Sequence, residues 1–160
     1  MAEGFRILSQ SPAQTRAVGE ALGREARPGD VLALIGDLGA GKTVLAKGIL
    51  SGLGGDPDAV TSPTFVLMVR HEGRLPLFHF DAYRLSGGAE IVEIGAEEAF
   101  YGEGVSVVEW AGRVADVLPR VFAPEVAHVG ITCTVGGQAS VGWPSVAQPS
   151  VVRASSPPRI

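Results

Sequence analysis

Asparagine is absent from this 160-residue sequence. The usual guanine-reading motif, N-K-x-D, needs an asparagine, so its absence disfavours GTP as a ligand. Lysine is scarce as well, because it occurs only at Lys42 and Lys47, and the formal net charge is −4. A chain with no lysine-rich patch is a poor candidate for gripping nucleic acid through its own surface.

Cysteine is nearly absent too, because Cys133 is the only one in the sequence. A single cysteine can form neither an internal disulfide nor a zinc knuckle, so a reduced cytoplasm is the simplest location. The sequence has no apolar window of membrane-spanning length, and its first residues carry no cleavage signature. We therefore expect a cytoplasmic protein without a membrane partner.

The pattern that is present alternates short apolar runs with segments at helical spacing. Residues 31–36 read VLALIG, a continuous apolar run typical of a buried central strand. Gly73 is placed for a hairpin between two later strand candidates. The pattern predicts an α/β three-layer sandwich with a mixed sheet that includes an antiparallel hairpin. We expect one domain over residues 1–146 and a disordered Ser/Pro-rich tail over 147–160.

The most specific motif is GDLGAGKT at residues 36–43, which matches G-x-x-x-x-G-K-[ST] in full. A buried-strand candidate precedes it and a helix candidate follows, as in P-loop NTPase-like folds. The glycines let successive backbone N–H groups face phosphates, and the helix N-terminus adds partial positive charge. We expect Lys42 to reach the β- and γ-phosphates and the Thr43 hydroxyl to coordinate Mg²⁺.

Two acidic residues follow apolar runs at the ends of strand candidates. Asp81 ends LFHFD and Glu109 ends VSVVE. A P-loop enzyme needs such a carboxylate across from the loop, to hold Mg²⁺ or to orient water. We expect Glu109 to bind Mg²⁺ directly or through water, and Asp81 to be a Mg²⁺ ligand or the base for the attacking water. The alternatives are a turn-capping acid at Asp81 and a helix-start acid at Glu109.

Other polar and aromatic residues have less specific patterns. Strand alternation places His79 on the same face as Asp81. Trp110 could stack on a base or a partner, or could serve packing alone. His71 and His128 are expected to face solvent and are given no role.

Four segments together resemble one known family. GDLGAGKT, SPTF, HFDAYRL and VVEW occur in the order and approximate spacing of the bacterial TsaE family, also called YjeE. The resemblance extends over roughly residues 11–135. It implies the ATPase that supports threonylcarbamoyladenosine (t6A) formation at adenosine 37 of tRNA. It also implies the TsaB and TsaD proteins as partners, with tRNA contacted only indirectly.

The resemblance also implies site residues. Catalytic roles fall on Lys42, Asp81 and Glu109, and the Mg²⁺ shell falls on Thr43, Asp81 and Glu109. ATP-binding positions comprise the loop and two outlying pairs near the nucleobase: Asp37, Leu38, Gly39, Ala40, Gly41, Lys42, Thr43, with Ser11 and Pro12, and Gly136 and Gly137.

Two other functions stay open on the residues alone. One is a nucleotide-gated binding module whose hydrolysis is incidental. The other is a small-molecule kinase, although the scattered arginines include no arginine-rich lid.

Overall fold

The structure is a computed structural model that describes residues 6–61, 66–114, 126–133 and 139–142. Its elements in chain order are β1 (Arg6–Ser9), α1 (Pro12–Glu25), β2 (Val31–Ile35), α2 (Lys42–Gly52), η1 (Pro57–Ala59), β3 (Met68–His71), β4 (Leu77–Asp81), α3 (Gly88–Glu93), α4 (Ala96–Phe100), β5 (Val105–Glu109), η2 (Ala111–Arg113), β6 (Val126–Cys133) and β7 (Ala139–Gly142). The segments η1 and η2 are short 3₁₀ helices.

The described strands form one mixed sheet in the order β1-β7-β6-β2-β5-β4-β3. Strands β6, β2, β5 and β4 run parallel to one another. The other pairings, β3 with β4 and β7 with both β6 and β1, are antiparallel. The predicted fold class is confirmed, including the hairpin around Gly73 that joins β3 to β4.

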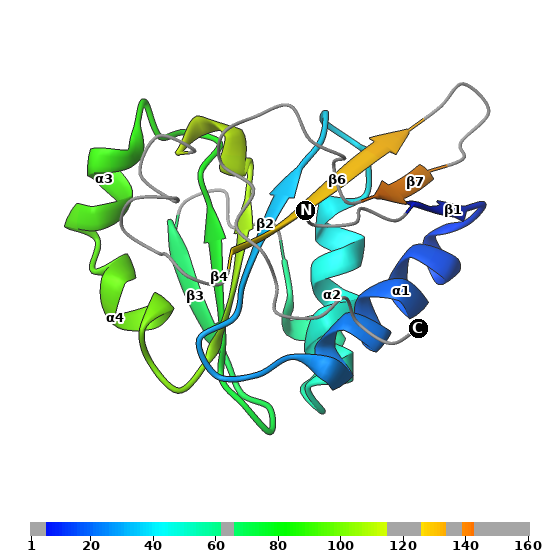
Figure 1. Ribbon diagram of the computed structural model, residues 1–160, viewed down its shortest axis with the longest axis horizontal. Coiled ribbons are helices and arrows are strands. Elements are labelled where there is room, and N and C mark those ends of the chain that lie inside the picture. The colour runs from blue at the N-terminus through cyan, green and yellow to red at the C-terminus, as the bar shows by residue number, and fades with distance from the viewer. Residues whose placement is uncertain (1–5, 62–65, 115–125, 134–138, 143–160) are drawn as a thin grey trace, which may run out of the picture.

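Helices cover both faces of this sheet. In Figure 1, α1 and α2 lie on one side of the sheet and α3 and α4 on the other. Because successive strand residues point to opposite faces, each strand contributes to two cores. In β2, Leu32 and Leu34 pack in the core beside α1 and α2, whereas Val31 and Ala33 belong to the core beside α3 and α4.

Glycine lets α1 and α2 approach each other closely. An added Cβ at Gly19 or Gly23 of α1 would lie 2.4 or 2.1 Å from a carbonyl oxygen of α2. A Cβ added at Gly48 or Gly52 of α2 would lie 2.2 or 2.1 Å from a carbonyl oxygen of α1. The two helices therefore touch backbone to backbone, which holds the start of α2 against α1.

The start of α1 is capped by side chains of its own first residues. Ser11 is the N-cap, its hydroxyl accepts a hydrogen bond from the Gln14 backbone N–H at 3.2 Å, and Pro12 is the first helical residue. The Gln14 side chain accepts from the backbone N–H of Gln10 at 2.7 Å, one residue earlier than in a capping box. Gly95 separates α3 from α4 and adopts a left-handed conformation, with φ 80°.

Several predictions lie outside the described residues: the tail over 147–160, the loop at Gly136 and Gly137, and the side chain of His128.

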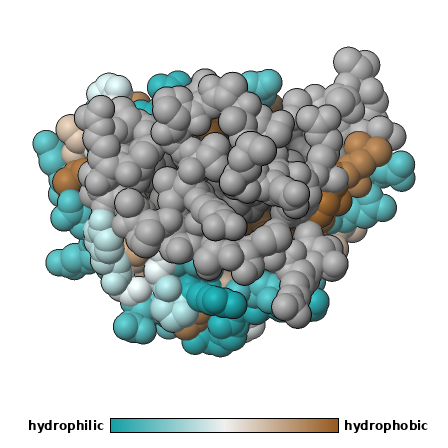
Figure 2. Space-filling view, viewed as in Figure 1, coloured by the Kyte–Doolittle hydropathy of each residue, from teal (hydrophilic) through white to brown (hydrophobic). Residues whose placement is uncertain are grey.

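Within the described part of the chain, no helix combines the length and apolarity needed to cross a bilayer. Coloured residues along the lower edge in Figure 2 are mostly hydrophilic. Large exposed apolar side chains include Leu38 in the glycine loop, 85% exposed, and Tyr83 after β4, 48% exposed.

Candidate functional site

The two predicted acids lie side by side at the ends of neighbouring parallel strands. Asp81 of β4 pairs with Glu109 of β5, and each is the last residue of its strand. Glu109 is also opposite Leu34 of β2, one residue before that strand ends and the glycine loop begins. The carboxyl ends of these three parallel strands thus gather both acids and the loop at one edge of the sheet.

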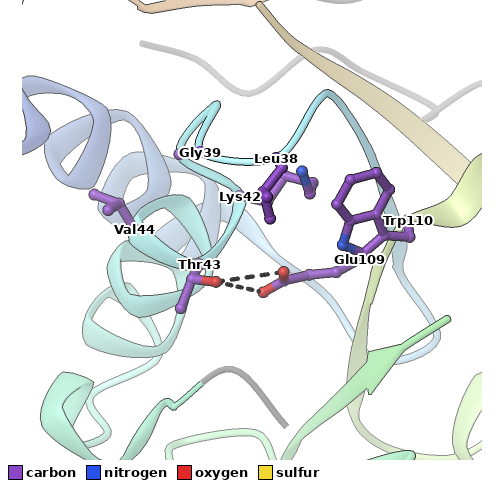
Figure 3. A pocket seen from close by; sticks show the side chains of 8 residues that line it. Leu38, Gly39, Lys42, Thr43, Val44, Glu109 and Trp110 are labelled. Carbon is purple, nitrogen blue, oxygen red and sulfur yellow. Dashed lines mark hydrogen bonds between the residues drawn. The ribbon is translucent and has the colours of Figure 1, made fainter. Parts of the chain in front are cut away.

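The Glu109 carboxylate faces the start of α2. The Thr43 hydroxyl donates to it, with distances of 3.2 Å to Oε1 and 3.4 Å to Oε2. Figure 3 shows the two side chains pointing toward each other, one from the helix and one from the strand. Glu109 is only 2% exposed, so its carboxylate depends on protein donors for hydrogen bonds.

The Lys42 side chain folds back against the glycine loop. Its ammonium donates to the carbonyl oxygens of Gly36 at 2.7 Å and Asp37 at 2.6 Å. The same group lies 3.9 Å from the centroid of the Trp110 ring, a cation–π distance. Burial lowers the pKa of Lys42, and nearby carboxylates, Glu109 foremost, oppose that shift.

Asp81 is held by the turn that follows it. Its carboxylate accepts the backbone N–H of Tyr83 at 2.8 Å, and the residue is 9% exposed. Burial raises the pKa of Asp81, while the hydrogen bond from Tyr83 acts in the opposite direction. Asp81 is therefore a turn-capping acid, as in the alternative interpretation, and also lies beside Glu109 at the strand ends.

The glycine loop surrounds a small open cavity. Gly39 and Gly41 have φ of 77° and 108°, a region that residues with side chains rarely adopt. The cavity has a volume of about 240 Å³. Its lining comprises loop, helix and strand-end residues: Leu38, Gly39, Gly41, Lys42, Thr43, Val44, Glu109 and Trp110.

The outlying predicted residues have different positions. The first turn of α1 lies beside the loop, because a Cβ at Gly41 would be 3.8 Å from the Cγ2 atom of Thr15. Ser11 and Pro12 begin that same turn. Asp37 and Ala40 are joined within the loop by a hydrogen bond from the Ala40 N–H to the Asp37 carbonyl at 3.1 Å.

Three features of the site were not predicted. His79 contacts Glu109, with 2.9 Å between Nε2 and Oε1. Trp110 adopts a left-handed conformation, φ 58°, and its ring lies 5.0 Å from that of Tyr83. The prediction that His71 faces solvent is wrong: it is 7% exposed, its ring centroid lies 6.2 Å from that of His79, and burial lowers its pKa.

Donor chemistry at the site suits magnesium. Among residues 6–61, 66–114 and the described parts of β6 and β7, no group of three or more His, Cys, Asp or Glu could hold a metal ion. Thr43 and Glu109 instead offer hard oxygen donors within 3.2 Å of each other. Mg²⁺ is commonly bound by one or two such protein oxygens, with water and substrate phosphates as its other ligands.

The strand order and the loop between β2 and α2 define the class of this protein as P-loop NTPase-like α/β. The fold is similar to the crystal structure of YdiB from Bacillus subtilis, with a TM-score of 0.71 and 32% identity over 89% of this chain and 86% of that one. A family model described as threonylcarbamoyl adenosine biosynthesis protein TsaE matches residues 9–138. The chain belongs to the TsaE family, and the resemblance inferred from its four motifs is confirmed.

Curated relatives agree with this assignment. The chain is 46% identical over 116 residues to a Treponema pallidum protein named tRNA threonylcarbamoyladenosine biosynthesis protein TsaE, covering 72% of this chain and 85% of that protein. A Bacillus subtilis protein of the same name is 44% identical over 111 residues, covering 69% and 68%. A role in t6A biosynthesis follows from the family.

Proposed function

We propose that this protein binds and hydrolyses ATP with Mg²⁺, and thereby supports a TsaB–TsaD assembly in t6A modification of adenosine 37 in tRNA. The observation that carries the proposal is the contact between Thr43, at the start of α2, and the buried Glu109 carboxylate across from the loop. A glycine loop and an acid in this relation are the two parts that P-loop nucleotide hydrolysis requires.

Phosphate binding is supported by the loop and the helix behind it. With Gly39 and Gly41 at positive φ, the loop turns into an 11-residue helix whose N-terminus favours anions. The Lys42 ammonium donates to two loop carbonyls. A phosphate oxygen offers the same ammonium a negatively charged acceptor, which adds the attraction of an ion pair to the hydrogen bond. We expect the Lys42 ammonium to donate to phosphate oxygens, in place of the two loop carbonyls, when ATP binds.

The acids divide the remaining tasks. Thr43 and Glu109 would hold Mg²⁺, which supplies neutralisation of the charge on the β- and γ-phosphates. Asp81 is suited to accept a proton from the attacking water, since burial raises its pKa toward that of a useful base. The hydrogen bond from the Tyr83 N–H holds the Asp81 carboxylate in one orientation. Catalysis would then rest on the positioning of the reacting groups and on stabilisation of the phosphate charge.

The proposed partners are proteins, with tRNA engaged through them. A net charge of −4 and only two lysines give the chain little means of following a phosphate backbone. Its family name ties it to tRNA modification all the same. A protein that acts on a TsaB–TsaD assembly would take part in tRNA modification without needing a basic surface of its own.

ATP turnover of the parent protein and of Asp81→Ala, each with and without TsaB–TsaD, tests the proposal. We expect low turnover alone, an increase with the assembly, and loss of turnover in the variant. Turnover that no partner addition changes would contradict a partner-dependent ATPase. If Asp81→Ala abolished hydrolysis yet still supported t6A formation, the protein would be a nucleotide-gated module. Phosphate recovered on an acceptor other than water would indicate a kinase.

A further inference from the structure

A buried histidine contacts the carboxylate at the centre of the site. His79 Nε2 lies 2.9 Å from Glu109 Oε1, and the two residues are 0% and 2% exposed. The same oxygen is the nearer acceptor for the Thr43 hydroxyl. Glu109 thus lies between a donor from α2 and a donor from β4.

Strand geometry accounts for this contact. His79 is two residues before Asp81, so both side chains point toward the face covered by α1 and α2. In the parallel pairing, His79 is opposite Val107, which is two residues before Glu109 on β5. On this face of β4 and β5, Val107 at the level of His79 is apolar, and so are Leu77 and Val105 one layer deeper. The histidine is therefore the last layer beneath the acids, at the boundary between the apolar core and the polar site.

The hydrogen-bond pattern selects one tautomer. An ionised carboxylate only accepts hydrogen bonds, so the hydrogen shared with Glu109 must be carried by Nε2 of His79. Nδ1 of His79 is buried and has no hydrogen-bond partner among the described residues. A hydrogen on Nδ1 would leave a buried donor unsatisfied, whereas a lone pair there is less costly. The arrangement therefore favours the Nε2–H form.

We propose that His79 is a positioning residue: its Nε2–H holds the Glu109 carboxylate in the orientation that faces Thr43. The expected loss of activity rests on the proposed ATPase function, whereas the hydrogen bond between His79 and Glu109 can be tested without ATP. Partners that orient a carboxylate at a metal site typically contribute 10- to 100-fold to affinity or activity, and we expect a loss of about that size without His79.

His71 provides a matched control. It is also a buried histidine, it lies on the adjacent strand β3, and its Nε2 likewise has no hydrogen-bond partner among the described residues. Its ring packs near that of His79. Replacing it with leucine removes a buried imidazole without removing the donor to Glu109.

The kinetic experiment compares His79→Leu, His79→Gln and His71→Leu with the parent, using ATP, Mg²⁺ and the TsaB–TsaD assembly. We expect His79→Leu to lower kcat about 10- to 100-fold, with KM for ATP nearly unchanged because Lys42 and the loop are intact. Glutamine places an N–H close to the position of Nε2, so His79→Gln should recover most of kcat. His71→Leu should retain the parent kcat. Equal kcat in His79→Leu and the parent, or equal impairment of His79→Gln and His79→Leu, would overturn the proposal.

A spectroscopic experiment needs no turnover. Long-range ¹H–¹⁵N correlation spectra of the full-length, nucleotide-free protein report which ring nitrogen of each histidine carries the hydrogen. We expect His79 as the Nε2–H tautomer, with its resonance shifted in Glu109→Ala. An Nδ1–H tautomer in the parent would refute the proposal. If the parent showed no turnover, the ATPase function would fail while these spectra still decided the hydrogen bond.

Discussion

Replacing Gly48 with alanine tests the close packing that positions the loop. The new Cβ would lie 2.2 Å from the carbonyl oxygen of Arg16 and 3.0 Å from the backbone nitrogen of Glu20. Ordinary carbon–oxygen contacts begin at about 3.3 Å, so α1 and α2 would have to separate by roughly 1 Å. Because the obstructing atoms are backbone, no rotamer change relieves the clash.

The expected magnitude is the difference between two opposing effects. Overpacking of a close interface costs about 1–3 kcal/mol, and more where backbone must shift. Alanine in a helix returns about 1 kcal/mol relative to glycine. Because the obstructing atoms are backbone, the cost lies at the upper end, about 3 kcal/mol. We therefore expect Gly48→Ala to lower the free energy of unfolding by about 2 kcal/mol, which lowers Tm by roughly 4–8 °C in a domain of this size.

Urea unfolding and thermal melting measure this change, with Gly112→Ala as the control. A Cβ at Gly112 would meet no atom within 4 Å, so that variant should match the parent closely. A Gly48→Ala protein as stable as the parent would refute the backbone-to-backbone packing. The variant should also turn over ATP more slowly, because α2 begins at Lys42 and Thr43 and its displacement would move Thr43 away from Glu109.

Three more predictions follow from single contacts. Lys42→Ala should weaken ATP binding about 10- to 100-fold by calorimetry, the worth of a hydrogen bond to a charged group, while its melting curve stays cooperative. Arg74→Ala should lower the free energy of unfolding by about 1 kcal/mol, since its guanidinium donates to three carbonyls at the end of α1; an unchanged urea midpoint would contradict this. Burial raises the pKa of Asp81, so the native state binds more protons than the unfolded state between the two pKa values, and stability falls as pH rises through that window. The free energy of unfolding of Asp81→Asn should therefore increase relative to the parent as pH rises above the ordinary aspartate pKa of about 4, and a difference independent of pH would argue against a raised pKa.

The elements around the loop were predictable because their signals are local. The apolar run of β2, the glycine loop and the start of α2 each occupy a short stretch whose residue types permit few alternatives. The capping of α1 by Ser11 is local in the same sense. The placement of Asp81 and Glu109 at strand ends also followed from their position after apolar runs.

The alignment of neighbouring strands, and with it the face on which each side chain lies, could not be predicted in this way. That Asp81 is opposite Glu109, and that His79 reaches the same carboxylate, depends on how β4 and β5 align, and no local pattern fixes this alignment. The sequence predicts an exposed His71 because Glu72 and Gly73, which are typical of a turn, follow it directly. Its pairing opposite Leu77 instead turns its side chain toward the apolar face.

The conformation of Trp110 shows why the strand must end at Glu109. A non-glycine residue at φ 58° costs roughly 1–2 kcal/mol relative to an ordinary conformation. The left-handed turn directs the chain into η2 and leaves the indole against the Lys42 ammonium at 3.9 Å and the Tyr83 ring at 5.0 Å. These cation–π and aromatic contacts, each worth about 0.5–1.5 kcal/mol, offset most of that cost. If the strand continued past Glu109, the next side chain would alternate to the opposite face and the indole could not cover the loop. The strained residue therefore couples the end of β5 to the lysine of the loop, and it accounts for the aromatic wall of a cavity otherwise built from the loop, α2 and Glu109.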